Sequence, residues 1–213
     1  MKYNRNQIKE TVEGLGYKYF KTGVLNVNII GIRNSDTNGK VTNKFDDTMT
    51  ISYIDNDMNW QYFEYNCTTD PGDDHVDNPM MEKGTAILKP GQYPKSHKIR
   101  LHAGKYTALG QQNNVKVYRD ANKDGVYDYN EDTVDEGIFG INIHRATALS
   151  GKTSTYVDRW SAGCQVIASN EDWHEFLNIC QEARSEWSNN FTYTLITSND
   201  IKCASERNNG VTC

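Results

Sequence analysis

Two residues whose types support acyl-transfer chemistry lie in the second half of the chain, His144 and Cys164. A cysteine thiolate is a strong nucleophile, and a nearby histidine can remove the thiol proton. The three residues before the cysteine are Ser161, Ala162 and Gly163. A glycine at this place lets a substrate carbonyl approach the backbone closely, so that nearby N–H groups can bind an oxyanion. The alternative interpretation is a buried structural thiol and a hydrogen-bonded histidine at a strand end.

The pattern formed by these residues resembles that of the L,D-transpeptidase (YkuD-like) catalytic domain. In that family a histidine precedes a Ser/Thr-His-Gly-Cys motif at a similar distance, and here 16 residues separate His144 from Ser161. The resemblance implies that Cys164 is the nucleophile, that His144 is its base, and that Gly163 lies in the oxyanion hole. Ser161 is the first residue of the motif. The matched region covers only the segment from the histidine to the cysteine.

The motif departs from the family at two places. Ala162 stands where a second histidine is usual, and Gln165-Val166 stands where an apolar residue followed by Arg or Asn is usual. The resemblance implies a sandwich-like or barrel-like β domain that acts on peptidoglycan stem peptides, with an amine or water as acceptor. The departures suggest a divergent member with different substrate contacts. The alternative function is a calcium-stabilised β module that binds the cell wall without turnover, in which Ala162 marks a decayed enzyme.

Four residues around the pair are candidates for contacting a substrate: Arg145, Tyr156, Arg159 and Trp160. Either arginine could hold a substrate carboxylate through two parallel hydrogen bonds, or it could form a surface ion pair. The two aromatic residues could line a groove between the base and the nucleophile. A further histidine, His102, could lie near the site or be structural.

The segment from Asp120 to Glu131 matches the calcium-loop pattern D-x-[DN]-x-[DN]-G-x5-E at every specified position. Calcium takes six to eight oxygen ligands, and alternate positions of such a loop supply them. The predicted ligands are Asp120, Asn122, Asp124, the carbonyl of Val126, Asp128 directly or through water, and Glu131. No long helix is expected on either side, so the loop would connect strands. The alternative is an acidic, solvated turn.

Composition excludes several classes of function. The chain has 213 residues and a net charge of −5. It contains no cluster of basic residues, so nucleic acid is not expected as a partner. The chain contains no run of 18 apolar residues, so no transmembrane helix is expected. The first 20 residues lack the apolar core of a signal peptide. No organic cofactor is predicted. A protein acting on peptidoglycan would work at the cell envelope, outside the cell, or after release by a phage.

The five cysteines do not form a zinc pattern with the five histidines. We interpret Cys67 and Cys180 as structural. Cys203 and Cys213 bracket a short polar segment and could form a disulfide in an oxidising compartment. The alternative is a pair of free thiols.

Alternating apolar residues and turn signals predict many short strands, which favours a mainly β domain. The expected strands are 24–33, 48–54, 60–67, 85–88, 98–102, 106–109, 115–118, 138–144, 164–168 and 191–197. The strands 48–54 and 60–67 are expected to form a hairpin, and 68–82 is expected to be a long loop. One helix is expected over 170–187 behind an N-cap at Ser169, with Trp187 on its apolar face. We expect a helical extension at 1–20, a catalytic domain at 21–199 with the calcium loop inserted at 120–131, and a polar tail at 200–213.

Overall fold

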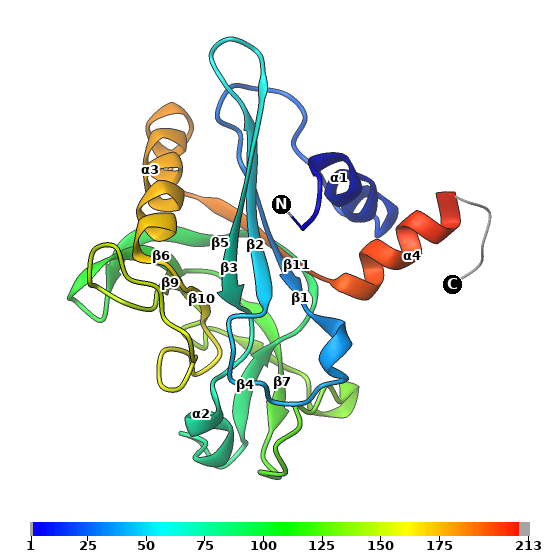
Figure 1. Ribbon diagram of the computed structural model, residues 1–213, viewed down its shortest axis with the longest axis vertical. Helices are drawn as coiled ribbons and strands as arrows, with labels where there is room; N and C mark the ends of the chain where they lie inside the picture. Colours follow the sequence, from blue (N-terminus) through cyan, green and yellow to red (C-terminus); the bar gives the residue numbers. More distant parts are fainter. Residues whose placement is uncertain (1, 209–213) are drawn as a thin grey trace.

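The chain forms a closed barrel of eight strands, with a smaller three-stranded sheet at one end of it (Figure 1). The computed structural model describes residues 2–208. Around the barrel the strands follow the order β1-β11-β5-β6-β9-β10-β3-β2. Their bounds are β1 Asn28–Arg33, β2 Asp47–Ile54, β3 Trp60–Thr68, β5 Gly91–His102, β6 Tyr106–Gln111, β9 Ile143–Arg145, β10 Gln165–Ile167 and β11 Phe191–Thr197.

Most neighbouring strands of the barrel run antiparallel, including the hairpins β2–β3 and β5–β6. Two neighbouring pairs are parallel, β1 with β11 and β9 with β10. The first of these pairs joins an early strand to the last one and closes the barrel. The second places the segments that carry His144 and Cys164 side by side.

The small sheet has the order β4-β7-β8, with β4 at Thr85–Leu88, β7 at Val115–Asp120 and β8 at Asp135–Gly137. Ala86, Leu88 and Val117 of this sheet belong to the same apolar core as the barrel interior, so the two sheets pack together. The loop from β7 to β8 carries the predicted calcium ligands and includes the short 3-10 helix η2, Glu131–Thr133.

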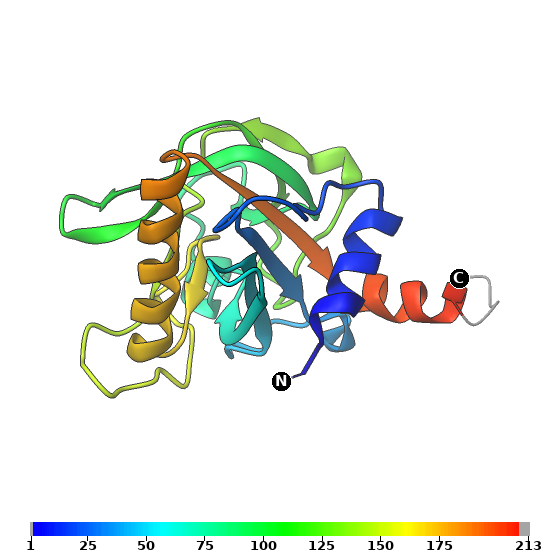
Figure 2. The same ribbon diagram turned by 90° about the horizontal axis from the view of Figure 1, so that it is seen from above.

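Helices cover two sides of the barrel (Figure 2). On one side α3, Asn170–Glu186, begins after Ser169, whose hydroxyl accepts the N–H of Asp172 as the predicted cap. Trp173 and Phe176 of this helix are buried in the barrel core. On the other side α1, Arg5–Gly14, and α4, Ser198–Asn208, contact each other and cover an apolar face formed by β1 and β11. The remaining short helices are η1, Ser35–Thr37, and α2, Asp73–Asp77.

The predicted mainly β character is confirmed, as are the β2–β3 hairpin, the N-terminal helix and the helix after Ser169. Over its described part, the expected polar tail lies in the helix α4, which continues to Asn208 and buries Ile201 and Ala204. Trp187 caps the end of α3 and is 57% exposed, so it does not lie on the buried face. Cys213 lies outside the described residues.

The strand expected over 138–144 is much shorter than predicted, since only Ile143–Arg145 pairs as β9. Gly140 has a φ of +78°, which an extended strand does not adopt. The side-chain oxygen of Gln111 accepts the N–H groups of Phe139 and Ile141, so these donors are satisfied without a strand partner. The loop expected over 68–82 also contains α2.

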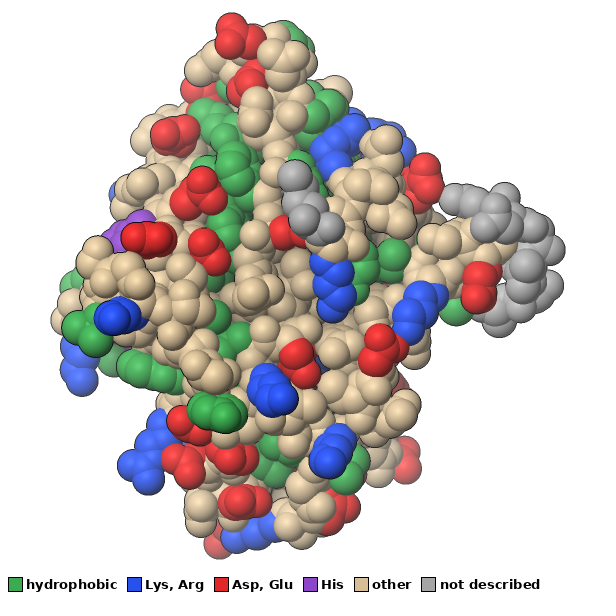
Figure 3. All heavy atoms as spheres, viewed as in Figure 1, with side chains coloured by type: hydrophobic (Ala, Val, Ile, Leu, Met, Phe, Trp, Pro, Cys, Tyr) green, Lys and Arg blue, Asp and Glu red, His purple; other side chains and the backbone are tan. Residues whose placement is uncertain are grey.

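Acidic and basic side chains are interspersed over the face shown in Figure 3. Within residues 2–208, no helix combines the length and apolar character needed to span a bilayer.

Candidate functional site

His144 and the cysteine segment lie on the outer face of two adjacent parallel strands. Val166 of β10 is the registered neighbour of His144 on β9. Ile143 and Ile167 belong to the barrel core. Since side chains alternate along a strand, His144 and Val166 point away from the barrel interior. Cys164 lies directly before β10, and its sulfur donates to the carbonyl of Gly140 in the segment that leads to β9.

The imidazole of His144 is held in one orientation by its neighbours. Its Nδ1 lies 2.8 Å from the carbonyl oxygen of Arg145 and 3.2 Å from the hydroxyl of Tyr106. A carbonyl only accepts hydrogen bonds, so Nδ1 carries the proton and Nε2 keeps its lone pair. The ring of His102 lies beside it, with 4.5 Å between the ring centroids. Nε2 is therefore the atom that can act as a base.

Burial keeps the imidazole neutral. His144 is only 4% exposed. Burial lowers its pKa to about 4, and the positive charges of His102 and Arg145 act in the same direction, while the hydrogen bond to the Arg145 carbonyl opposes them. At neutral pH the imidazole is therefore uncharged.

The thiol of Cys164 is neutral as well. Burial raises its pKa to about 11, and the backbone N–H of Asn142 opposes that shift by stabilising the thiolate. The sulfur donates its proton to the carbonyl oxygen of Gly140, with 3.4 Å between Sγ and O. The two side chains are therefore a neutral thiol and a neutral imidazole rather than a thiolate–imidazolium pair.

The turn before the cysteine is fixed by Ser161, which is fully buried. Its hydroxyl donates to the carbonyl of Cys164 at 2.8 Å and accepts the N–H of Gly163 at 3.1 Å. Gly163 has a φ of +116°, and a Cβ at this residue would lie 2.3 Å from the carbonyl oxygen of Ala86. Only glycine fits there. Because its N–H already has a partner, Gly163 is a weaker oxyanion donor than the sequence suggests, and the N–H of Cys164 is the alternative.

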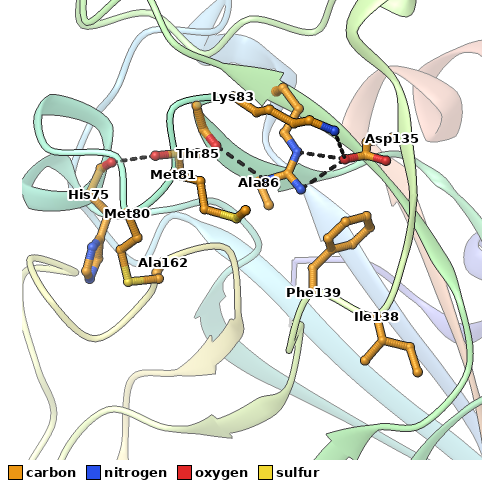
Figure 4. Close-up of a pocket in the computed structure, with 12 residues that line it drawn as sticks. His75, Met80, Met81, Lys83, Thr85, Ala86, Asp135, Ile138, Phe139 and Ala162 are labelled. Carbon is orange, nitrogen blue, oxygen red and sulfur yellow. Dashed lines mark hydrogen bonds and ion pairs between the residues drawn. The ribbon is translucent and has the colours of Figure 1, made fainter.

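A pocket of about 390 Å³ opens beside this turn (Figure 4). Ala162 lines it from the turn. Ile138 and Phe139 line it from the segment that leads to Gly140, whose carbonyl accepts the thiol proton. The pocket therefore adjoins both chain segments that hold Cys164.

The other side of the pocket combines sulfur, apolar and charged side chains. Met80 and Met81 are exposed at its mouth. Arg119 also lines it, but its guanidinium donates to the carboxylate of Asp135 at 3.1 Å. His75 of α2 lines the pocket as well, so an imidazole is present near Ala162, where the motif lacks its second histidine.

Of the four predicted substrate contacts, Arg145 is the one next to the thiol–imidazole pair. It follows His144 in β9. Its guanidinium carbon lies 4.4 Å from the centroid of the Tyr106 ring, which is a cation–π contact. Arg145 is thus placed to meet an anionic group of a ligand.

The other three predicted contacts lie elsewhere. Arg159 is highly exposed and forms an ion pair with Asp74 of α2 at 2.5 Å, and Trp160 borders the same shallow depression. Tyr156 is exposed and pairs with Lys44 through an isolated β-bridge. The structure therefore groups Arg159 and Trp160 with α2 rather than with Arg145.

In the predicted calcium loop, Asp120 is the last residue of β7 and pairs with Thr85 of β4. It is 1% exposed, and neither carboxylate oxygen has a hydrogen-bond partner. Burial raises its pKa, and the carboxylates of Asp128 and Asp124 raise it further. The N–H groups of Asp128 and Asn122 moderate this shift without reaching hydrogen-bond geometry.

The next loop residues form a compact polar turn. The side-chain amide of Asn122 donates to Asp124 at 3.2 Å and to Asp128 at 2.9 Å. The N–H of Val126 donates to the carboxylate of Asp124 at 2.9 Å. Gly125 has a φ of +76°, the left-handed conformation that the pattern reserves for glycine.

Glu131 has different partners. It is exposed at the start of η2, forms an ion pair with Lys89 and accepts the hydroxyl of Tyr118 at 3.1 Å. Across the described residues, no group of three or more His, Cys, Asp or Glu side chains is arranged to hold a metal ion. The predicted ligand set is therefore gathered only in part.

Three residues that contact the imidazole or the sulfur were not predicted from the sequence: Tyr106, Asn142 and Gly140. The place of His102 was left open. Only the hairpin offered a signal: His102 and Tyr106 flank the turn between β5 and β6. The pairing of β6 with β9 then brings this hairpin to His144, and no local pattern reveals that pairing.

Comparisons of the chain with protein-family models, with curated proteins and with solved structures found no match.

Proposed function

We propose that the protein is a cysteine-dependent acyl-transfer enzyme that acts on peptidoglycan stem peptides as an L,D-transpeptidase or L,D-carboxypeptidase. The observation that supports the chemical part is the pairing of β9, which carries His144, with β10, which directly follows Cys164, together with Nε2 of the histidine as the basic atom. The substrate class rests on the resemblance of the motif alone. The two parts are therefore tested separately.

The proposed reaction begins with attack of the Cys164 sulfur on a peptide carbonyl carbon, while the thiol proton passes to Nε2 of His144. A backbone N–H at the turn binds the resulting oxyanion. The intermediate then collapses, the C–N bond breaks, and the leaving amine takes the proton from the imidazolium. A thioester on Cys164 is left. An incoming amine or water, deprotonated by His144, attacks the thioester and releases the thiol.

The surroundings of the pair suit a peptide that carries a negative charge. Arg145 offers a guanidinium over the ring of Tyr106, whose hydroxyl contacts the imidazole. The pocket next to Ala162 offers apolar contacts with Phe139 and the exposed methionines at its mouth. A small residue at 162 leaves this pocket open toward the turn. The Ala162 departure from the motif is consistent with a wider site for the peptide on that side.

The decisive experiment is incubation with defined muropeptides followed by mass analysis of both the products and the acid-quenched protein. A transpeptidase gives a cross-linked or exchanged product, a carboxypeptidase gives a shortened peptide, and both give a protein adduct with the mass of the acyl group. The adduct should be absent from Cys164→Ala. Product without any adduct and with full activity in Cys164→Ala would refute the cysteine mechanism. A thioester formed only with unrelated acyl donors would refute the substrate class alone.

A second candidate function is a cell-wall-binding module without turnover. It is favoured by one observation, the neutral thiol whose proton is donated to Gly140 rather than to a base. The two candidates separate in a sedimentation assay with insoluble peptidoglycan. A binder is retained with an unchanged affinity in Cys164→Ala and yields neither product nor adduct.

A further inference from the structure

We propose that the loop from Asp120 to Asp128 binds one calcium ion through Asp120, Asn122, Asp124, the carbonyl of Val126 and Asp128. Glu131, the last position of the sequence pattern, stays with Lys89 and is not required. This inference does not depend on the proposed function. It rests on the state of Asp120 together with the residues that surround it.

The first argument is the buried carboxylate itself. Asp120 is 1% exposed, and both of its oxygens lack a partner. An unpaired buried carboxylate is costly, and such groups are normally paired or coordinate a metal. Within residues 2–208, no lysine or arginine forms an ion pair with Asp120, and the adjacent Arg119 pairs with Asp135. A bound cation would supply the missing partner.

The second argument is the charge and chemistry around that carboxylate. The carboxylates of Asp124 and Asp128 lie close together, since both accept hydrogen bonds from the side-chain amide of Asn122. Their mutual repulsion favours a divalent cation. The donors are hard oxygens, and a flexible loop with a backbone carbonyl suits calcium better than the strict octahedron that magnesium requires. Water would complete the six to eight ligands.

The amide of Asn122 shows how the loop would respond. It donates to Asp124 and Asp128, and thus occupies the place of a positive partner between them. Rotation of this amide would present its oxygen instead of its nitrogen to the ion. The change needs no movement of β7 or β8, because both strands are fixed by pairing within the small sheet.

Hydrogen bonds connect the loop to the turn before Cys164. The hydroxyl of Tyr127 donates to the carbonyl of Pro71 at 2.7 Å. The N–H of Gly72, which follows Pro71, donates to the carbonyl of Ser161 at 2.9 Å. Ser161 in turn fixes the carbonyl of Cys164. Calcium would therefore steady a loop that supports the turn carrying the cysteine.

The test is thermal unfolding and calorimetric titration of the full chain with calcium chloride, compared with a chelator and with magnesium chloride. At a calcium concentration about 100-fold above the dissociation constant, the melting temperature should rise by roughly 5–10 °C. Asp120→Asn should remove this rise. In chelator the same variant should melt at the wild-type temperature or above it, because the substitution removes an unpaired buried charge.

Two further variants make the result specific. Asp132→Asn removes one negative charge from the neighbouring η2 turn, outside the proposed ligands, and should keep the full calcium response. Glu131→Gln should bind calcium within about threefold of the wild-type affinity, whereas a bidentate ligand at this position would lower it at least tenfold. No heat of binding and no shift with 5 mM calcium would overturn the site, and an equal response of Asp120→Asn and wild type would do so as well.

Discussion

The thiol site and the acidic loop treat buried polar groups in opposite ways. At the thiol site, Sγ of Cys164, Nδ1 of His144 and the hydroxyl of Ser161 each have a hydrogen-bond partner within the chain. In the loop, the carboxylate of Asp120 has none. The first arrangement is complete without a ligand and holds its groups neutral. The second is charged and incomplete, and a cation from outside the chain would complete it.

This difference separates two kinds of site that look alike in a sequence, where both are short patterns of reactive residue types. In a cluster whose polar groups all have partners within the chain, the orientation of the reactive groups is fixed before a substrate arrives. In a cluster with an unpaired buried charge, that charge favours the binding of an ion that can pair with it. A reagent that modifies the sulfur of Cys164 should therefore leave calcium binding at the loop unchanged.

The largest expected effect is at the sulfur. Cys164→Ala should lower turnover of muropeptides by more than about 10⁴-fold, because no other group can form the thioester. Its calcium-induced melting shift should equal that of wild type, since the loop is intact. Product analysis and thermal unfolding measure the two effects. Cys203→Ala, which changes a cysteine on α4, is the matched control and should retain activity; a loss of activity there would point to general misfolding.

The next effect is at the base. His144→Gln should lower kcat by about 10²- to 10⁴-fold, the range of general acid–base catalysis. In wild type, kcat/KM should rise with pH through the lowered pKa of about 4, because the imidazole is active when deprotonated. It should then be level up to neutral pH. A limb near the ordinary histidine value of about 6.5 would contradict the buried, neutral imidazole.

A smaller effect is expected from the turn that links the two regions. Gly163→Ala should destabilise the fold by about 3 kcal/mol, because φ is +116° and the new Cβ meets the Ala86 carbonyl. Gly16→Ala is the matched control: φ is +79°, and nothing lies within 4 Å of its Cβ. It should cost about 1 kcal/mol. Denaturant unfolding measures both, and equal losses would show that the contact with the small sheet is unimportant.

The smallest effect concerns Arg145. Arg145→Ala should raise KM by about tenfold and leave kcat within about threefold, if the guanidinium binds a substrate carboxylate and takes no part in the chemistry. Arg159→Ala is the comparison, because its partner is Asp74 of α2, and it should change neither constant. Steady-state kinetics with peptides that carry or lack the free carboxylate decide the point.

The sequence predicted local features well because local physics determines them. The cap at Ser169 and the β2–β3 hairpin follow from neighbouring residues and are confirmed. The segment over 138–144 was predicted too long, because its apolar pattern does not show that the side chain of Gln111 would satisfy its backbone. The helix in the expected polar tail was not predicted, because its few apolar residues become a buried face only against α1.

At the site, residue types and spacing pointed to His144 and Cys164, but they could not give protonation states. Those depend on burial that only the packed barrel defines. In the same way the calcium pattern named Glu131 from its position, whereas Lys89, distant in the sequence, claims that carboxylate in the fold. Long-range partners decide such cases, and a single sequence does not reveal them.

The parallel pairing of β1 with β11 has a consequence for synthesis of the chain. Ile29 pairs with Tyr193, so the barrel cannot close until residue 193 has left the ribosome. Until then β1 and β5, the two barrel neighbours of β11, each present an unpaired edge. Contacts of such large sequence separation slow folding. The nascent chain should therefore need protection from edge-to-edge aggregation during this interval, and refolding from denaturant should be sensitive to protein concentration.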